Sequence, residues 1–249
     1  MSAFVTVNGD IAVEAVISIP RVGSWHADIN LAGGSNAATG PVTISIADGF
    51  MTMVGFCFRF GVFSDYVRMR IVGGNGTLRT TALGPKAYQG VPLKVALQDV
   101  LSQAGETLSP ASDQGLLAGN LPFWATIATG VRGAGGSLTS LLKAGPPGSQ
   151  GQSPVWRMAS TATPSGIAFD GSVWAGYETW PIAPILDFQD YVYELDDATV
   201  GKIQIAPNLP LLLPGTVFRR TGTPDRQITY VRHQVEATKH LRTMAYYET

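Results

Sequence analysis

Apolar and polar residues alternate with a period of two through the first third of the chain, a pattern typical of half-buried β-strands. From Ser24 to Leu31 the odd-numbered residues are apolar and the even-numbered ones are polar. Further strands are expected over residues 42–47, 50–60 and 66–72. In the third of these four segments, five large apolar residues are predicted to share one side: Phe50, Val54, Phe56, Phe58 and Phe60.

Short polar pairs mark turns between these strands. Asp48–Gly49 is a strong hairpin signal, and Ser64–Asp65 ends the third strand. The run RIVGGNGTLR, residues 70–79, raises the question of a phosphate-binding loop. A Walker loop needs a closing Gly-Lys-Ser/Thr, and a dinucleotide-binding loop needs a helix after its last glycine. Residues 77–81 are β-prone instead, so we expect Asn75–Gly76 to form a turn.

Helical periodicity occurs only in the middle of the chain. Residues 92–105 carry apolar residues at helical spacing, with Pro92 at the expected first helical position and Gly105 just past the end. A shorter helix is predicted over 137–143. The glycine- and proline-rich run 145–154 then predicts an exposed, mobile loop.

Strand patterns return in the second half. A strand is expected over residues 155–158, and another over 172–181 after a hairpin turn at Asp170–Gly171. Residues 229–237 alternate again, with Val231, His233 and Val235 on the apolar face. The fold class expected is mainly β with a small α/β insertion.

The amino-acid composition favours some classes of protein and argues against others. Charged residues make up 14% of the 249 residues, about half the usual share, and the mean hydropathy is +0.14. Such a charge-poor surface favours a protein largely covered by partners. The single cysteine, Cys57, excludes a disulfide framework and is expected to be a small buried hydrophobe. A net charge of −1 gives no indication of nucleic-acid binding. Neither a signal peptide nor a membrane-spanning run is expected.

Candidate chemistry is sparse. No two of the three histidines, His26, His233 and His240, have the spacing of metal ligands, and His233 is expected in the core. No nucleophile elbow occurs, since Ser153 and Ser165 lack its strand–turn–helix context. The carboxylates of Asp187–Asp197 fit neither a glycosidase pair nor a calcium loop. Four aromatic residues could line a sugar-binding platform but favour packing: Trp156, Trp174, Tyr177 and Trp180.

Three stretches, in order and spacing, resemble the baseplate hub proteins of tailed phages. The first extends from Asp48 through the glycine-rich turn and the helix to Ser109. The second comprises Val155–Met158 and Asp170–Pro181, and the third extends from Leu213 to Thr243. The resemblance is to hubs like that of phage Mu, to late-control D proteins and to the base of the type VI secretion spike. For a contractile-tail hub the chain is short, and no lysozyme or needle extension is expected.

This resemblance implies two tail-tube-like β-barrel domains: residues 1–84 as part of the first, 155–249 as the second with its closing strands, and 85–154 as the inserted helical segment and mobile loop. It also implies a homotrimeric ring in the virion tail, assembled in the host cytoplasm. The ring would join the tail tube or distal tail protein to a spike or tip, contact other baseplate proteins and let the genome pass. It implies no catalytic residue, cofactor, metal, specific nucleic-acid recognition or membrane insertion.

Two other classes stay open. In a tail-associated peptidoglycan or glycan hydrolase, carboxylates such as Asp187 and Asp190 would act with the tryptophans. In a carbohydrate-binding module, Trp174 or Trp180 would be exposed.

Overall fold

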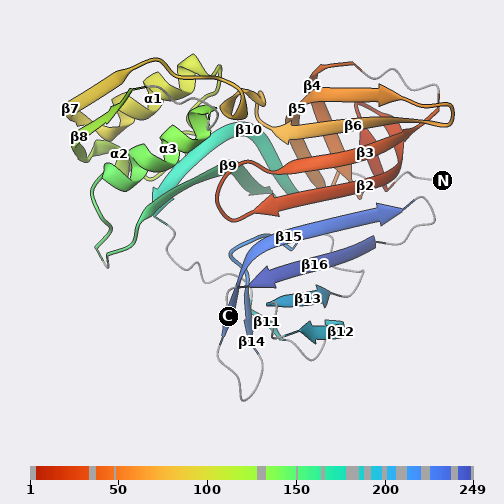
Figure 1. The fold of residues 1–249 in the computed structure, drawn as a ribbon. Helices are drawn as coiled ribbons and strands as arrows, with labels where there is room; N and C mark the ends of the chain where they lie inside the picture. Colours follow the sequence, from red (N-terminus) through yellow and green to blue (C-terminus); the bar gives the residue numbers. More distant parts are fainter. Residues whose placement is uncertain are drawn as a thin grey trace.

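A computed structural model describes residues 4–33, 38–47, 49–127, 133–149, 151–163, 166–177, 185–187, 192–197, 201–205, 212–219, 225–236 and 241–247. Within these ranges the strands form a 14-stranded sheet and a separate two-stranded sheet, and the α-helices gather at one end of the molecule (Figure 1). The mainly β fold class with a helical insertion is therefore confirmed.

Six strands of the first half close into a barrel in the order β1-β4-β5-β6-β3-β2, which the β1–β2 pairing completes. Their bounds are β1 Val5–Val7, β2 Asp10–Pro20, β3 His26–Ala32, β4 Gly40–Ile46, β5 Met51–Val62 and β6 Tyr66–Gly73. The alternation predicted the inner face correctly for β3 and β6, whose apolar residues Ile29, Met69 and Ile71 are buried. Closure explains the alternation, because each strand has one face inside and one outside.

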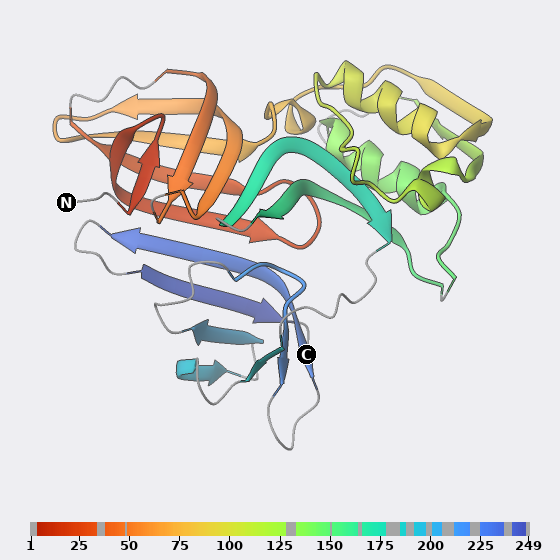
Figure 2. The same ribbon diagram turned by 180° about the vertical axis from the view of Figure 1, so that it is seen from behind.

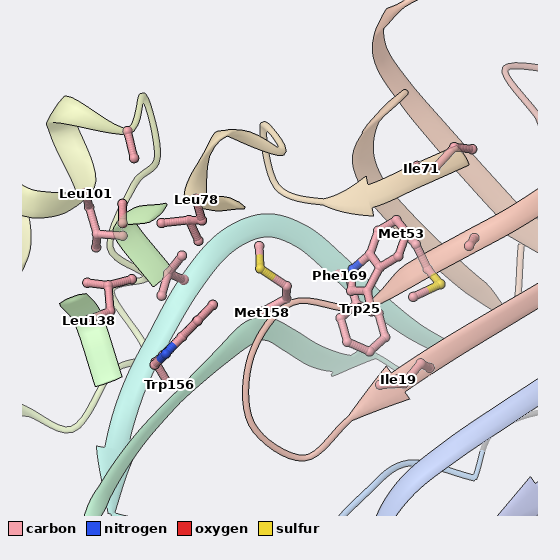
Figure 3. Packing of buried hydrophobic residues seen from close by; sticks show 14 of the residues in the cluster. Ile19, Trp25, Met53, Ile71, Leu78, Leu101, Leu138, Trp156, Met158 and Phe169 are labelled. Atoms are coloured by element: carbon pink, nitrogen blue, oxygen red, sulfur yellow. The ribbon is translucent and has the colours of Figure 1, made fainter. Parts of the chain in front are cut away.

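Trp25 fills one end of this barrel and is 1% exposed (Figure 3). Two glycines make room for its indole ring. A Cβ atom on Gly55 would lie 2.6 Å from Cη2 of Trp25, and one on Gly73 would lie 2.6 Å from its Nε1. No side chain fits at such distances, so the tryptophan and the two glycines form one packing unit.

The prediction that Phe50 to Phe60 share one side of a strand is wrong, because β5 contains a β-bulge. The pairing of β5 with β6 shifts between Cys57 and Arg59, so that Arg59 lies opposite Arg70 and Phe60 lies opposite the buried Met69. Phe60 therefore does not share a side with Phe56, because the extra residue reverses the alternation. Before the bulge, the inner face carries smaller residues, and Cys57 is buried as expected.

The glycine-rich stretch after β6 is a turn, as predicted, with positive φ at Gly74 and Gly76. The expected β character of residues 77–81 is wrong, since Thr77–Arg79 forms a short 3₁₀-helix. The hydroxyl of Thr77 donates to the carbonyl of Ala104, which ties this turn to the following helix. That tertiary contact overrides the β propensity of the threonines.

The inserted segment packs three α-helices on a two-stranded sheet. These elements are β7 Lys86–Pro92, α1 Leu93–Gln103, α2 Gln114–Ala118, β8 Asn120–Thr126 and α3 Gly133–Ala144. Pro92 is the N-cap of α1 rather than its first residue, and Gly105 adopts the left-handed conformation expected after the helix. Helix α2 was not predicted; the Asp113 carboxylate caps it by accepting a hydrogen bond from Leu116 N at 3.0 Å.

A long curved hairpin, β9 Pro154–Thr163 and β10 Gly166–Tyr177, connects the barrel to the helices (Figure 2). Residues 167–169 of β10 pair in parallel with residues 51–53 of β5. The hairpin turn predicted at Asp170–Gly171 is wrong, because β10 continues through these residues as a bulge. Gly171 has φ +83°, a conformation that suits a bulge as well as a turn. Buried side chains form a continuous core from barrel to helices (Figure 3).

The second half of the described chain continues the sheet across β2. Its strands are β11 Ile185–Asp187, β12 Val192–Asp197, β13 Lys202–Ile205, β14 Val217–Arg219, β15 Arg226–Glu236 and β16 Leu241–Tyr247. Strand β15 pairs antiparallel with β2 over seven residues and continues the sheet into β16, β13 and β12. The predicted apolar face of the last long strand is confirmed, since Val231, His233 and Val235 are buried. Thus one sheet spans both halves of the chain.

Two hydrogen bonds hold the predicted loop 145–154. The Tyr177 hydroxyl donates to the carbonyl of Pro146 at 2.6 Å, and Gly148 and Gln152 pair through their backbones. Among its described residues, Gly145 to Ser149 form neither helix nor strand; Gly145, Pro146 and Gly148 are partly buried, whereas Pro147 and Ser149 are exposed.

Candidate assembly surface

Exposed large apolar side chains concentrate on one strand and the turn that follows it. Within the described residues, six of the eleven such side chains fall between residues 50 and 63. These six define the β5 surface: Phe50, Val54, Phe58, Phe60, Val62 and Phe63. Val62 is 71% exposed and Phe63 50%. Exposed apolar side chains in this number along one strand make it a candidate contact site for another macromolecule.

The bulge in β5 creates this surface. Phe58 is the extra residue and projects from the strand, while Phe60 and Val62 turn to the other side beyond the end of the barrel. The turn between β5 and β6 lies at the end of the barrel away from the helices (Figure 1). Phe63 stacks on Tyr66 with ring centroids 4.7 Å apart, which stiffens the turn.

Three arginines, Arg59, Arg68 and Arg70, lie on the outer face of β5 and β6. Arg70 holds Asp28 through two hydrogen bonds, Nε–Oδ1 at 2.7 Å and Nη2–Oδ2 at 2.8 Å. These bonds lower the pKa of the Asp28 carboxyl below its ordinary value. Arg59 and Arg68 have no ion-pair partner among the described residues, and both line a shallow cleft beside Gly61 and Phe63.

These arginines were not predicted as candidate residues. A usable signal was present, since Arg68 and Arg70 occupy the polar positions of β6 in an otherwise charge-poor chain. The position of Arg59 beside them depends on the bulge, which the period-two pattern does not reveal.

Backbone N–H groups of the glycine-rich turn bind a carboxylate of the protein itself. The Asn75 N–H points at both oxygens of Glu106, at 3.0 and 3.1 Å, and Glu106 is almost fully buried. Burial raises the pKa of the Glu106 carboxyl, although the hydrogen bonds act in the opposite direction. The turn therefore anchors the end of α1 to the barrel rather than holding a phosphate.

Glu106→Gln is expected to remove a pH dependence of stability. Because the folded-state pKa of Glu106 is raised, its stabilising contribution is full below the ordinary pKa and declines as the pH rises through the folded value. Urea unfolding of wild type and variant from pH 4 to pH 8 measures this. The wild-type advantage should shrink with rising pH; a constant difference would contradict the assignment. Glu106→Ala, which leaves the Asn75 N–H unpaired, should cost about 1–3 kcal/mol.

The described histidines form no joint site. His26 lies on the outer face of β3, whereas His233 is buried on the inner face of β15, where Nδ1 lies 3.0 Å from Thr243 Oγ1. Burial lowers the pKa of His233 to about 4, which fits the predicted core histidine. His240 lies outside the described residues.

His233 should make the fold acid-sensitive. A folded-state pKa near 4 against 6.5 when unfolded gives stability that is full above pH 6.5 and lost as the pH falls towards 4. The loss amounts to about 3 kcal/mol. Unfolding of wild type and His233→Leu at pH 7.5 and 4.5 tests this. Equal pH dependence in the two proteins would contradict it.

The tryptophans of the possible sugar platform take part in packing, as expected where they are described. Trp156 is buried and donates to Thr139 Oγ1 at 2.9 Å. Trp174 donates to the Ala111 carbonyl at 3.0 Å, and the Arg157 guanidinium lies 4.6 Å from the centre of its ring. The two rings lie on opposite faces of the hairpin, because Trp174 pairs with Arg157 and Trp156 with Ala175. Trp180 and the side chains of 187–197 lie outside the described part.

No group of three or more His, Cys, Asp or Glu side chains suited to a metal occurs in the described ranges. A search of the same ranges for a helix long and apolar enough to cross a membrane finds none.

Comparison with known proteins gives a fold but no sequence family. No protein-family model matches the chain, and no curated protein matches it in sequence. The prophage MuSo2 43 kDa tail protein from Shewanella oneidensis superposes with a TM-score of 0.66 at 11% identity, covering 97% of this chain and 96% of that one. The chain has a phage tail protein fold. A tail protein from Neisseria meningitidis MC58 agrees, with a TM-score of 0.63 at 13% identity and coverages of 98% and 96%.

The tail protein fold also occurs outside phages. The E. coli c3393 protein, described as a component of the type VI secretion system with structural similarity to T4 bacteriophage tail proteins gp27 and gp5, superposes with a TM-score of 0.64 at 12% identity. The match covers 98% of this chain and 76% of that protein. The resemblance noted in the sequence is thus confirmed at the level of a tail-like fold.

Proposed function

We propose that the chain is a structural tail protein, a baseplate hub or tail-tip adaptor that acts by assembly and not by turnover. The observation that carries this is the fold match over nearly the whole length of two phage tail proteins. It belongs, in this proposal, to the hub group that includes the Mu-like hubs, the late-control D proteins and the base of the type VI secretion spike. Its place is the virion tail, after assembly in the host cytoplasm.

Three copies form a ring in this proposal. Each copy contributes two barrel domains, residues 1–84 and 155–249, so that six similar units match a six-fold tail tube. Within each copy, the β2–β15 pairing joins the two halves into one sheet. The β5 surface supports the ring, because apolar area exposed on one chain is buried when copies associate.

The ring connects a tail tube or distal tail protein on one side to a spike or tip protein on the other. Residues 85–154 contact other baseplate proteins, and the genome passes through the central channel. Nothing in this role requires catalysis, a cofactor, sequence-specific nucleic-acid recognition or membrane insertion by this chain. A spike base in a secretion system would use the same surfaces.

Electron microscopy of the purified protein in negative stain tests the proposal. Rings with a pseudo-six-fold outline and a central hole are expected. Gold-labelled antibody against this chain should then bind at the distal end of tails that contain it. Labelling elsewhere on the particle, or no labelling of intact tails, would contradict the proposed place.

A further inference from the structure

A cleft of about 580 Å³ lies between the outer face of the sheet and the start of the helical segment. The sheet contributes His26 of β3 and Tyr230 of β15 to its lining. The other side includes Arg79, the last residue of the 3₁₀-helix, and Gly135 in the first turn of α3. The cleft is therefore built from elements that are far apart in the chain.

Part of the lining is apolar or aromatic. Val22 is exposed, whereas Leu78 and Trp156 are buried (Figure 3). Tyr230 is half-buried, and its ring packs edge-on against that of Tyr246 with centroids 5.3 Å apart. An apolar side chain that enters the cleft would therefore contact apolar and aromatic surface.

The charged part of the lining is basic. It comprises His26 and Arg79, and none of the described lining residues is acidic. Arg79 is exposed and forms no ion pair within the described ranges. Asp28, the carboxylate two residues from His26 on the same face of β3, is bound by Arg70. The cleft therefore carries positive charge that its own lining does not neutralise.

The pKa of His26 responds to this charge. Burial lowers it most, and the nearby Arg79 guanidinium lowers it further. Arg70 and Arg232 act in the same direction, against the Asp28 carboxylate. A carboxylate bound in the cleft would oppose these arginines and raise the pKa of His26.

We propose that this cleft binds an acidic segment of another tail protein, with carboxylates on Arg79 and His26 and an apolar side chain on the aromatic surface beside them. The inference rests on the proposed function, which supplies the class of partner. A carboxylate is favoured because Arg70 already binds one on this outer face through two hydrogen bonds. A peptide also offers acidic and apolar groups in series. Nucleic acid is disfavoured, since the net charge of −1 lacks a basic excess.

NMR of the full chain with ¹³C-labelled histidine tests this, because only three histidines give signals. The variant His26→Gln identifies the His26 signal. The probe acetyl-Glu-Glu-Leu-Glu-Glu-amide should shift that signal saturably and raise the pKa of His26, while the buried His233 stays unchanged. The uncharged peptide acetyl-Gln-Gln-Leu-Gln-Gln-amide should have no effect. Arg79→Gln should weaken binding of the acidic peptide about fivefold.

Arg242→Gln is the matched control. Arg242 is also an exposed arginine, but it lies on β16 and does not line the cleft. Its replacement should leave the affinity for the acidic peptide unchanged. An equal loss in Arg79→Gln and Arg242→Gln would overturn the proposal, because the peptide would then respond only to the overall charge of the chain.

Two further results would overturn the docking site. One is an unchanged His26 signal at every concentration of the acidic peptide. The other is tighter binding of inorganic pyrophosphate or of a single-stranded oligonucleotide, which would make the cleft a phosphate site. Neither result concerns the mass or the ring shape of the chain, so the docking site and the proposed function can fail separately. Circular dichroism of each variant confirms that it is folded.

Discussion

Replacing Trp25 by alanine should lower the free energy of unfolding by about 3–5 kcal/mol. The indole is enclosed in the barrel and packs directly against Gly55 and Gly73, so neighbouring side chains cannot close the space that it leaves. Loss of this packing should loosen the junction of β3, β5 and β6. Urea unfolding followed by circular dichroism measures the change.

Trp174→Ala is the matched control, because it removes the same side chain from a half-buried position on β10. Its expected cost is clearly smaller than that of Trp25→Ala. Equal losses for the two variants would contradict the view that the tryptophan and its two glycines determine how the barrel packs. Trp25→Phe should fall between wild type and alanine, since a smaller ring fills part of the space.

Replacing Phe60 and Phe63 by serine should disrupt association while the fold persists. Both side chains are exposed in the single chain, so their loss removes little folding energy. Central aromatic residues of an interface typically contribute about 2 kcal/mol or more each, which predicts association weaker by roughly 1,000-fold for the pair. Light scattering measures the mass, and thermal unfolding at low protein concentration checks the fold.

Phe123→Ser on β8 is the control for this surface. Phe123 is also an exposed phenylalanine, but it lies on the two-stranded sheet of the helical segment, far from β5 in the chain. Its replacement should leave the mass of the purified assembly unchanged. If Phe123→Ser dissociates the protein and the β5 double variant does not, the assembly surface has been placed on the wrong element.

The sequence predicted the regular parts of this fold well, because their patterns are local. The alternation from Ser24 to Leu31 reflects a strand with one face inside a closed barrel, and the apolar stripe of α1 reflects its contact with α3. Gly105 past the end of α1 could be identified because a left-handed position favours glycine.

The errors occurred where pairing between distant strands changes the local pattern. Asp170–Gly171 has the composition of a turn, yet β10 continues because it pairs with β9 on both sides of the bulge. Phe60 follows the alternation of β5 in sequence, but the bulge before it reverses its side. Short polar pairs favour a turn and a bulge alike, so the partner strand decides between them.

Only part of the candidate surface could be predicted from the sequence. Low charge and positive hydropathy indicated a protein covered by partners, but they did not say where. Phe50 and Val54 are exposed because barrel closure leaves the smaller residues Met51, Met53 and Cys57 inside, whereas the bulge determines the positions of Phe60 and Val62. The opposition of Arg59 to Arg70 is a matter of register, which depends on residues far apart in the chain.

The solution mass of the purified wild-type chain, measured by light scattering over a range of concentrations, tests the central claim most directly. The account predicts three times the mass of one chain, with dissociation favoured by dilution. A mass of one chain at every concentration would contradict it, because the exposed apolar groups on the barrel would then have no copy of the chain to bind.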